Sequence, residues 1–80
     1  MTTATITKTD AQVREAVLRQ LEWEPEINAN DIGVAVEEGV VTLTGFVDLY
    51  SERVAAERAA KRVYGVRGVA NELRVKPLHE

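Results

Sequence analysis

The chain has 80 residues, enough for one small domain, and its 45% hydrophobic and 29% charged residues are typical of a soluble globular protein. It has no cysteine, which excludes disulfides, thiolate zinc sites, a thiol nucleophile and a cysteine-borne lipid anchor. The net charge of −3 is unevenly spread: residues 1–48 hold three basic and nine acidic side chains, and residues 49–80 hold seven and four. We therefore expect no generic nucleic-acid binder, but the second half can present a local basic patch.

The N-terminal stretch MTTATITKTD has neither the basic start nor the long apolar run of a secretory signal. No other run approaches the roughly 20 apolar residues that span a membrane. We therefore expect a cytoplasmic protein without a transmembrane segment.

The first predicted element is a helix that begins after Thr9. Thr9 and Gln12 have the spacing of a capping box, in which each residue bonds the backbone of the other. The helix is expected to end near Trp23 or Glu24, because Pro25 disfavours helix at the residue before it. Apolar residues recur on one face of this helix, at Val13, Val17 and Leu21.

Alternation of apolar residues with small or polar ones predicts a half-buried strand over residues 32–37. Glu38-Gly39 predicts a tight turn, because glycine adopts a positive φ at low cost. A second strand over residues 40–47 completes an antiparallel hairpin. The inner face of the sheet is predicted to hold Ile32, Val34, Val36, Val41, Leu43 and Val47, with Val69, Leu73 and Val75 from a third strand.

A second helix is predicted to be capped by Asp48 or Ser51, and Gly65 is predicted to lie just past its last turn, where a left-handed C′ residue is expected. Small side chains let a helix lie close to a sheet, and Gly45 on the facing strand is predicted to leave room for it. The third strand follows and closes at Pro77. The inward face of the helix is predicted to be Ala55, Ala59 and Val63, flanked by Ala56 and Ala60.

The helix between the second and third strands forms a crossover, which makes those strands parallel if they pair. Both helices then cover the same face of the sheet. The sequence therefore predicts an α+β fold, an αββαβ two-layer sandwich whose three-stranded mixed sheet carries both helices on one face. We expect this domain over residues 9–76, between a flexible Thr-rich tail over 1–8 and a C-terminal tail over 77–80.

Two segments closely resemble the BON domain family, named for bacterial osmotic-shock and nodulation proteins. They are GVVTLTGFV over residues 39–47 and, after an alanine-rich helix, GVRGVANELRV over residues 65–75. The resemblance covers about residues 9–76. It implies an αββαβ sandwich, association with membranes or phospholipids, and occurrence in tandem copies or fused to other domains. The best-known members are mostly exported or anchored at the outer membrane. Without an export signal, this chain looks more like the first unit of a cytoplasmic protein with several such domains.

No residues form a group suited to catalysis, which needs a nucleophile or an acid/base pair within hydrogen-bonding reach. His79, the one histidine, is next to the C-terminus, Ser51 has no base nearby in any predicted element, and Glu37-Glu38 border a solvated turn. We therefore predict a non-enzymatic protein without cofactor or metal. Gly65-Val66-Arg67-Gly68 matches the G-x-x-G loop with which KH domains clamp nucleic acid. That loop joins two helices, whereas this one joins a helix to a strand, so we predict two turn glycines and no nucleic-acid partner.

The basic half of the chain supplies the first predicted binding surface. Contact with anionic lipid headgroups is worth ~1 kcal/mol per Lys or Arg near such a surface. The alternative is a solvated helix face whose charges pair with one another, for example Glu57 with Lys61 or Arg53. The residues predicted to bind lipid are Arg53, Arg58, Lys61, Arg62 and Arg67.

The sheet face without helices is the second predicted surface. Its residues are small or apolar apart from Glu72 and Arg74, and Phe46 is the largest. An exposed face of this kind often docks a partner or a neighbouring BON or other domain. The alternative is a surface with tolerated, scattered apolar residues. The residues predicted to bind a partner are Val40, Thr42, Thr44, Phe46 and Arg74.

Two single residues also carry expectations. Trp23 is predicted to fold over the Pro25 loop or Ile27 at the edge of the core, with an anchor in a membrane-binding tip as the alternative. Asn71 interrupts the apolar face of the third strand and is predicted to bond loop backbone, because a buried amide needs partners.

Overall fold

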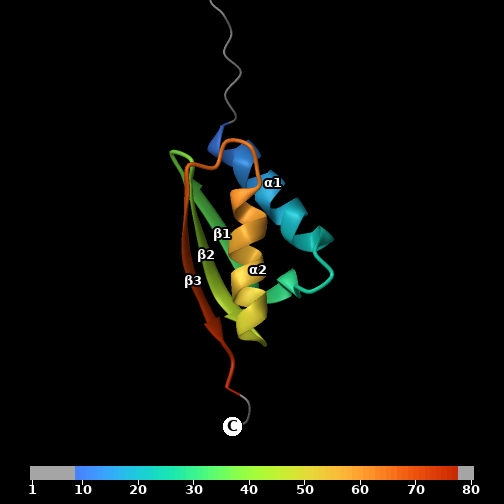
Figure 1. The fold of residues 1–80 in the computed structure, drawn as a ribbon. Coiled ribbons are helices and arrows are strands. Elements are labelled where there is room, and N and C mark those ends of the chain that lie inside the picture. The colour runs from blue at the N-terminus through green and yellow to red at the C-terminus, as the bar shows by residue number, and fades with distance from the viewer. Residues whose placement is uncertain (1–8, 78–80) are drawn as a thin grey trace, which may run out of the picture.

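A computed structural model describes residues 9–77 of the protein. Two helices pack side by side on one face of a three-stranded sheet, and no element of the described residues covers the other face (Figure 1). This arrangement confirms the predicted α+β sandwich. The elements, in chain order, are α1 (Asp10–Trp23), the short 3-10 helix η1 (Ala29–Asp31), β1 (Ile32–Glu37), β2 (Val40–Val47), α2 (Tyr50–Lys61) and β3 (Gly68–Val75).

The sheet has the order β1-β2-β3, so β2 lies in the centre and has a neighbour on each side. β1 pairs with β2 antiparallel through the hairpin, and β3 pairs with β2 parallel after the α2 crossover. The six rows in which β1 is paired therefore contain one residue from each strand. One such row is Ile32, Gly45 and Leu73.

The capping box at the start of α1 is present as predicted. The backbone N–H of Thr9 donates to Oε1 of Gln12 at 3.0 Å, and the N–H of Gln12 donates to Oγ1 of Thr9 at 3.2 Å. The helix ends at Trp23, before Pro25, also as predicted. Its predicted apolar face, Val13, Val17 and Leu21, is buried.

The hairpin turn is held by a contact that the sequence analysis missed. The Asp10 carboxylate accepts hydrogen bonds from the backbone N–H groups of Glu38 at 2.8 Å and Gly39 at 3.2 Å. Both turn residues have positive φ, 52° at Glu38 and 82° at Gly39. The start of α1 therefore fixes the turn between β1 and β2.

The start of α2 differs from the prediction, because neither Asp48 nor Ser51 caps it. The N-cap residue is Leu49, and the Glu52 carboxylate accepts from the N–H groups of Asp48 at 2.8 Å and Leu49 at 3.0 Å. Although it is charged, the Glu52 side chain is buried. Hydrogen bonds from two backbone N–H groups therefore replace those that its carboxylate would make to water. The predicted inward face was also partly wrong, because Ala55 is only half-buried. The buried small residues of this region are Ala56, Ala59, Ala60 and Val63.

Two glycines have roles other than those predicted. Gly45 has φ +112°, and a Cβ at this position would collide with the backbone of Asp31. Gly45 therefore makes room for the chain entering β1 and not for α2. Gly65 has the expected positive φ of 101°, but it lies beyond the C-cap residue Arg62 and so is not a C′ residue.

The core lies between the two helices and the inner face of the sheet. The predicted inner-face residues are buried or half-buried except Val75, which is 39% exposed at the end of β3. The prediction for Trp23 was wrong, because its side chain is 77% exposed. Asn71 bonds the backbone of α2 and of its own strand and not that of a loop: Nδ2 donates to the Arg53 carbonyl at 3.0 Å, and Oδ1 accepts from the N–H of Leu73 at 3.1 Å.

Candidate interaction surfaces

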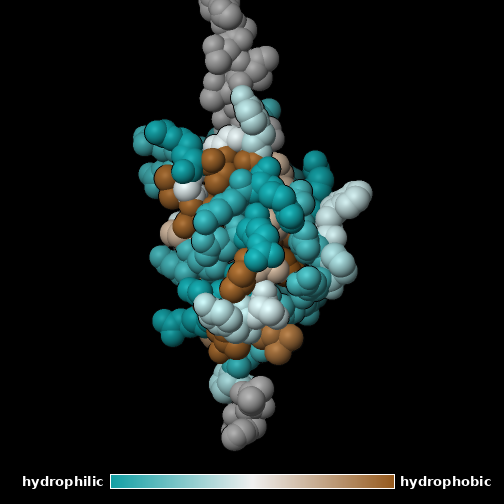
Figure 2. Space-filling model, viewed as in Figure 1, coloured by the Kyte–Doolittle hydropathy of each residue, from teal (hydrophilic) through white to brown (hydrophobic). Residues whose placement is uncertain are grey.

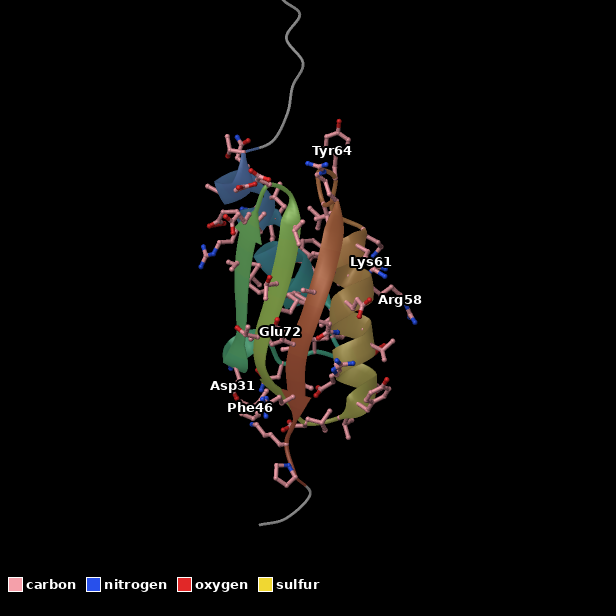
Figure 3. All side chains as sticks on the ribbon, turned by 90° about the vertical axis from the view of Figure 1, so that its left-hand side faces the viewer. Asp31, Phe46, Arg58, Lys61, Tyr64 and Glu72 are labelled. Carbon is pink, nitrogen blue, oxygen red and sulfur yellow. The ribbon has the colours of Figure 1, made fainter. Side chains whose placement is uncertain are left out.

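The outward side of α2 forms a shallow hollow of about 250 Å³. We call it the outer α2 surface. Arg58 and Lys61 point away from the sheet on this side of the helix (Figure 3). Tyr50, at the start of the helix, is 65% exposed. The surface therefore combines apolar and basic groups, and its lining residues are Tyr50, Arg53, Val54, Glu57, Arg58 and Lys61.

Arg53 has a structural role that limits its contact with a ligand. Its Nε donates to the Leu73 carbonyl at 3.0 Å, and its Nη2 donates to the Asn71 carbonyl at 3.1 Å. Both carbonyls belong to β3, so this side chain ties α2 to the edge of the sheet. The guanidinium also lies 5.9 Å from the centre of the Tyr50 ring, within range of a cation–π contact that orients the ring.

Two further predicted lipid-binding cations form ion pairs. Lys61 Nζ lies 3.0 Å from Glu57, and Arg62 Nη2 lies 2.7 Å from Glu24. The hydrogen bond from Lys61, with a second from Asn71, lowers the pKa of Glu57 below its ordinary value. Arg58, by contrast, has no ion pair among residues 9–77. It is the cation of the outer α2 surface most available to an external anion.

Arg67 lies apart from the other predicted cations, next to the β1–β2 turn. Its backbone N–H donates to the Gly39 carbonyl at 2.7 Å. Its side chain borders a separate, open hollow of about 540 Å³, together with Glu37, Glu38, Val40 and Thr42. The five predicted lipid-binding residues therefore do not form one patch. The structure brings Arg53, Arg58 and Lys61 together and places Arg62 and Arg67 elsewhere.

The uncovered side of the sheet is the second candidate surface, which we call the open face. Figure 3 looks onto it, with Phe46 and Glu72 labelled. Val40 and Phe46 are its exposed large apolar residues, at 44% and 47%. The strand pairing brings the five predicted partner-binding residues onto this one face, on two adjacent strands. Its residues are Gly33, Ala35, Val40, Thr42, Thr44, Phe46, Ala70, Glu72 and Arg74.

Side chains of α1, α2 and β3 cover part of both edges of the sheet. Nε of Arg14, on α1, donates to the Val34 carbonyl of β1 at 3.0 Å. On the opposite edge, Arg53 and Asn71 occupy two carbonyls and one N–H of β3. An added strand would need these backbone groups. The edges are therefore less open to a partner than the flat face between them.

Nothing in residues 9–77 forms a metal-binding group of three or more His, Asp or Glu side chains. No side-chain N or O that is buried within this range lacks a hydrogen-bond partner, so none is held ready for a ligand. Glu37 and Glu38 are exposed at the turn, and Ser51 is exposed on α2. His79 lies outside the described residues. The arrangement offers surfaces for contact and no assembled reactive centre within residues 9–77.

Two contributors to these surfaces were missed in the sequence. Tyr50 shares its helix side with Val54, four positions later, and this spacing is the signal that could have revealed an exposed apolar stripe. Arg14 gave no signal, because its partner Val34 lies 20 positions away. Apolar side chains also gather at the lower end of the molecule (Figure 2). Leu49, at the start of α2, and Val75, at the end of β3, are exposed as well.

Comparison with known proteins identifies this architecture. Residues 9–77 match the BON domain. The chain belongs to the BON domain family. It is similar to the osmotically-inducible protein Y of Escherichia coli (strain K12), with 34% identity over 71 residues, 89% of this chain and 35% of that protein. The resemblance noted in the sequence is thereby confirmed.

A solved structure supports the fold independently. The C-terminal domain of CdsD, described as the structural protein of the type III secretion system of Chlamydia trachomatis, superimposes with a TM-score of 0.70. The match covers 85% of this chain and 34% of that one at 20% identity. The chain thus spans about a third of the length of each of these two proteins. Within residues 9–77, no helix has the length and apolar character to cross a membrane.

Proposed function

We propose that this BON domain is a non-enzymatic binding module that attaches its parent protein to anionic phospholipid surfaces. The observation that carries the proposal is the outer α2 surface, where Arg58 lies in one hollow with Lys61, Tyr50 and Val54 and has no ion pair within residues 9–77. A tyrosine ring beside cations suits the boundary between lipid headgroups and acyl chains. The predicted lipid-binding set is thereby narrowed to Arg58 and Lys61, with Arg53 orienting Tyr50.

The test is co-sedimentation with vesicles of anionic or neutral phospholipid, at low and at physiological salt. We expect binding to anionic vesicles only, weakened by salt, because exposed charges are screened over a Debye length of about 8–10 Å. Arg58→Glu should abolish most of this binding. Arg19→Glu is the matched control, since Arg19 is an exposed cation on α1. Equal binding to neutral and anionic vesicles, or an equal loss in both variants, would refute the proposal.

We also propose a second binding function for the open face, which docks a protein domain. The observation favouring it is the exposure of Phe46 and Val40 on a face that neither α1 nor α2 covers. Phe46→Asp should weaken protein association and leave vesicle binding intact. Val54→Asp, an equivalent change on the outer α2 surface, should do the reverse. If Phe46→Asp leaves every protein association unchanged, the open face is not a docking surface.

A further inference from the structure

On the open face, the residues on the two sides of one row of the sheet differ in size and charge. The row Ile32–Gly45–Leu73 crosses all three strands. The next row toward the turn presents Gly33, Thr44 and Glu72 on the open face, and the next row the other way presents Phe46 and Arg74. A small residue and an acid therefore lie on one side of the central row, and a large residue and a base lie on the other.

Glu72 and Arg74 are exposed and have no ion pair within the described part of the chain. Both lie on β3, and successive residues on one face of a strand are separated by two positions. A second surface that carries an acid and a base in the reverse order would therefore place a base opposite Glu72 and an acid opposite Arg74. A second copy of this chain is such a surface.

We propose that the open face pairs with the open face of a second copy, about a twofold axis that crosses the strands at the row Ile32–Gly45–Leu73. This inference rests on the proposed docking function of the face and names its partner. The rotation reverses the strand direction, so Glu72 of each copy faces Arg74 of the other. A twofold interface makes each such contact twice. Sheets that pack face to face lie about 10 Å apart, a distance that these long side chains span.

The same rotation places Phe46 of each copy over Thr44 and Gly33 of the other. Because Gly33 has no side chain, the surface beside Thr44 stays flat. Adding a Cβ there would bring it to 2.9 Å from Oγ1 of Thr44, tighter than normal packing allows. The half-exposed Phe46 ring thus meets a shallow surface, and both charge pairs flank this contact on β3.

Because side chains occupy backbone groups at both edges of the sheet, the open face is the more accessible surface for pairing with a second copy. Arg14 occupies the Val34 carbonyl on β1, and Arg53 and Asn71 occupy backbone groups of β3. Edge-to-edge strand pairing of two copies would have to displace these side chains. Face-to-face packing displaces none of them.

The test is sedimentation velocity over a concentration series with charge-reversal variants. Glu72→Arg and Arg74→Glu each turn two attractive contacts into two repulsive ones, so each should weaken self-association at least about tenfold. An equimolar mixture of the two variants should associate like the unchanged chain, because every contact is again between opposite charges. The double variant, Glu72→Arg with Arg74→Glu, should also associate. Failure of the mixture to associate would overturn the proposed pairing, as would unaltered association of the single variants.

Arg58→Glu is the matched control and should leave self-association unchanged. The inference and the function on which it rests fail differently. If the unchanged chain is a monomer at all concentrations, the second copy is wrong as partner. The docking function itself is refuted only if Phe46→Asp also leaves capture of other domains unchanged. Circular dichroism of each variant separates a loss of pairing from a loss of fold.

Discussion

The two faces of the sheet use the same strands for different purposes. Along β2, Val41 and Leu43 point inward and are fully buried, while their neighbours Val40 and Thr42 point outward. The inner side carries aliphatic side chains that both helices cover, and the outer side carries small, charged and a few large apolar residues that no helix of residues 9–77 covers. The difference indicates that the inner face supplies most of the folding stability. Residues of the open face can therefore serve binding without a large cost in stability.

The largest expected effect contrasts two neighbours on β2. Leu43→Ala removes a fully buried side chain and leaves a cavity, so it should lower the free energy of unfolding by about 2–5 kcal/mol. Thr42→Ala, on the open face, should change it by less than about 1 kcal/mol. Urea unfolding followed by circular dichroism measures both. Similar losses in the two variants would show that the faces do not differ in this way.

The same contrast applies to two arginines of α2. Arg53→Ala removes two hydrogen bonds from a charged group to β3, so we expect a loss of about 1–3 kcal/mol of unfolding free energy. Arg58→Ala should stay within about 0.5 kcal/mol, because Arg58 has no ion pair in residues 9–77. In vesicle binding, by contrast, Arg58→Ala should cause the larger loss and Arg53→Ala the smaller one. A larger stability loss for Arg58→Ala would contradict the assignment of Arg53 to structure.

The smallest effect concerns pH. The pKa of Glu57 is lowered in the folded state, chiefly by Lys61 and then by Asn71, so its carboxylate stabilises the fold above its ordinary pKa of 4.5. This contribution is lost as the pH falls through the lowered folded value. The difference in urea midpoint between the unchanged chain and Glu57→Gln should therefore shrink as the pH falls below 4.5. If the difference in urea midpoint stays constant with pH, the charge of Glu57 does not contribute to stability.

Local patterns predicted most of the fold. The α1 capping box, the strand alternation and the inner-face residues involve neighbours in sequence, and the structure confirms them except at Val75. The errors lie where the deciding partner is distant or different from the expected one. Asp10 bonds the turn at Glu38 over a separation of 28 positions, and Gly45 is required by the backbone of Asp31. Neither contact leaves a periodic signal.

The candidate surfaces show the same limit. Alternation alone identified the open face, because the strands assign each residue to one side. The basic surface was predicted from charge and helix position, which do not reveal where a guanidinium bonds. Arg53 was therefore expected to bind lipid, although it bonds two carbonyls of β3. Trp23 was expected to fold over the Pro25 loop or Ile27 at the edge of the core, but it lies at the end of α1 and is exposed.

The most direct test of the account is a nitrogen-15 NMR titration with anionic short-chain phospholipid bicelles. The account assigns lipid contact to the outer α2 surface and protein contact to the open face. The backbone amide signals of Tyr50–Lys61 should therefore shift, while those of residues 40–46 should not. Shifts confined to residues 40–46, or no shift in α2, would contradict the central claim that the two surfaces have separate partners.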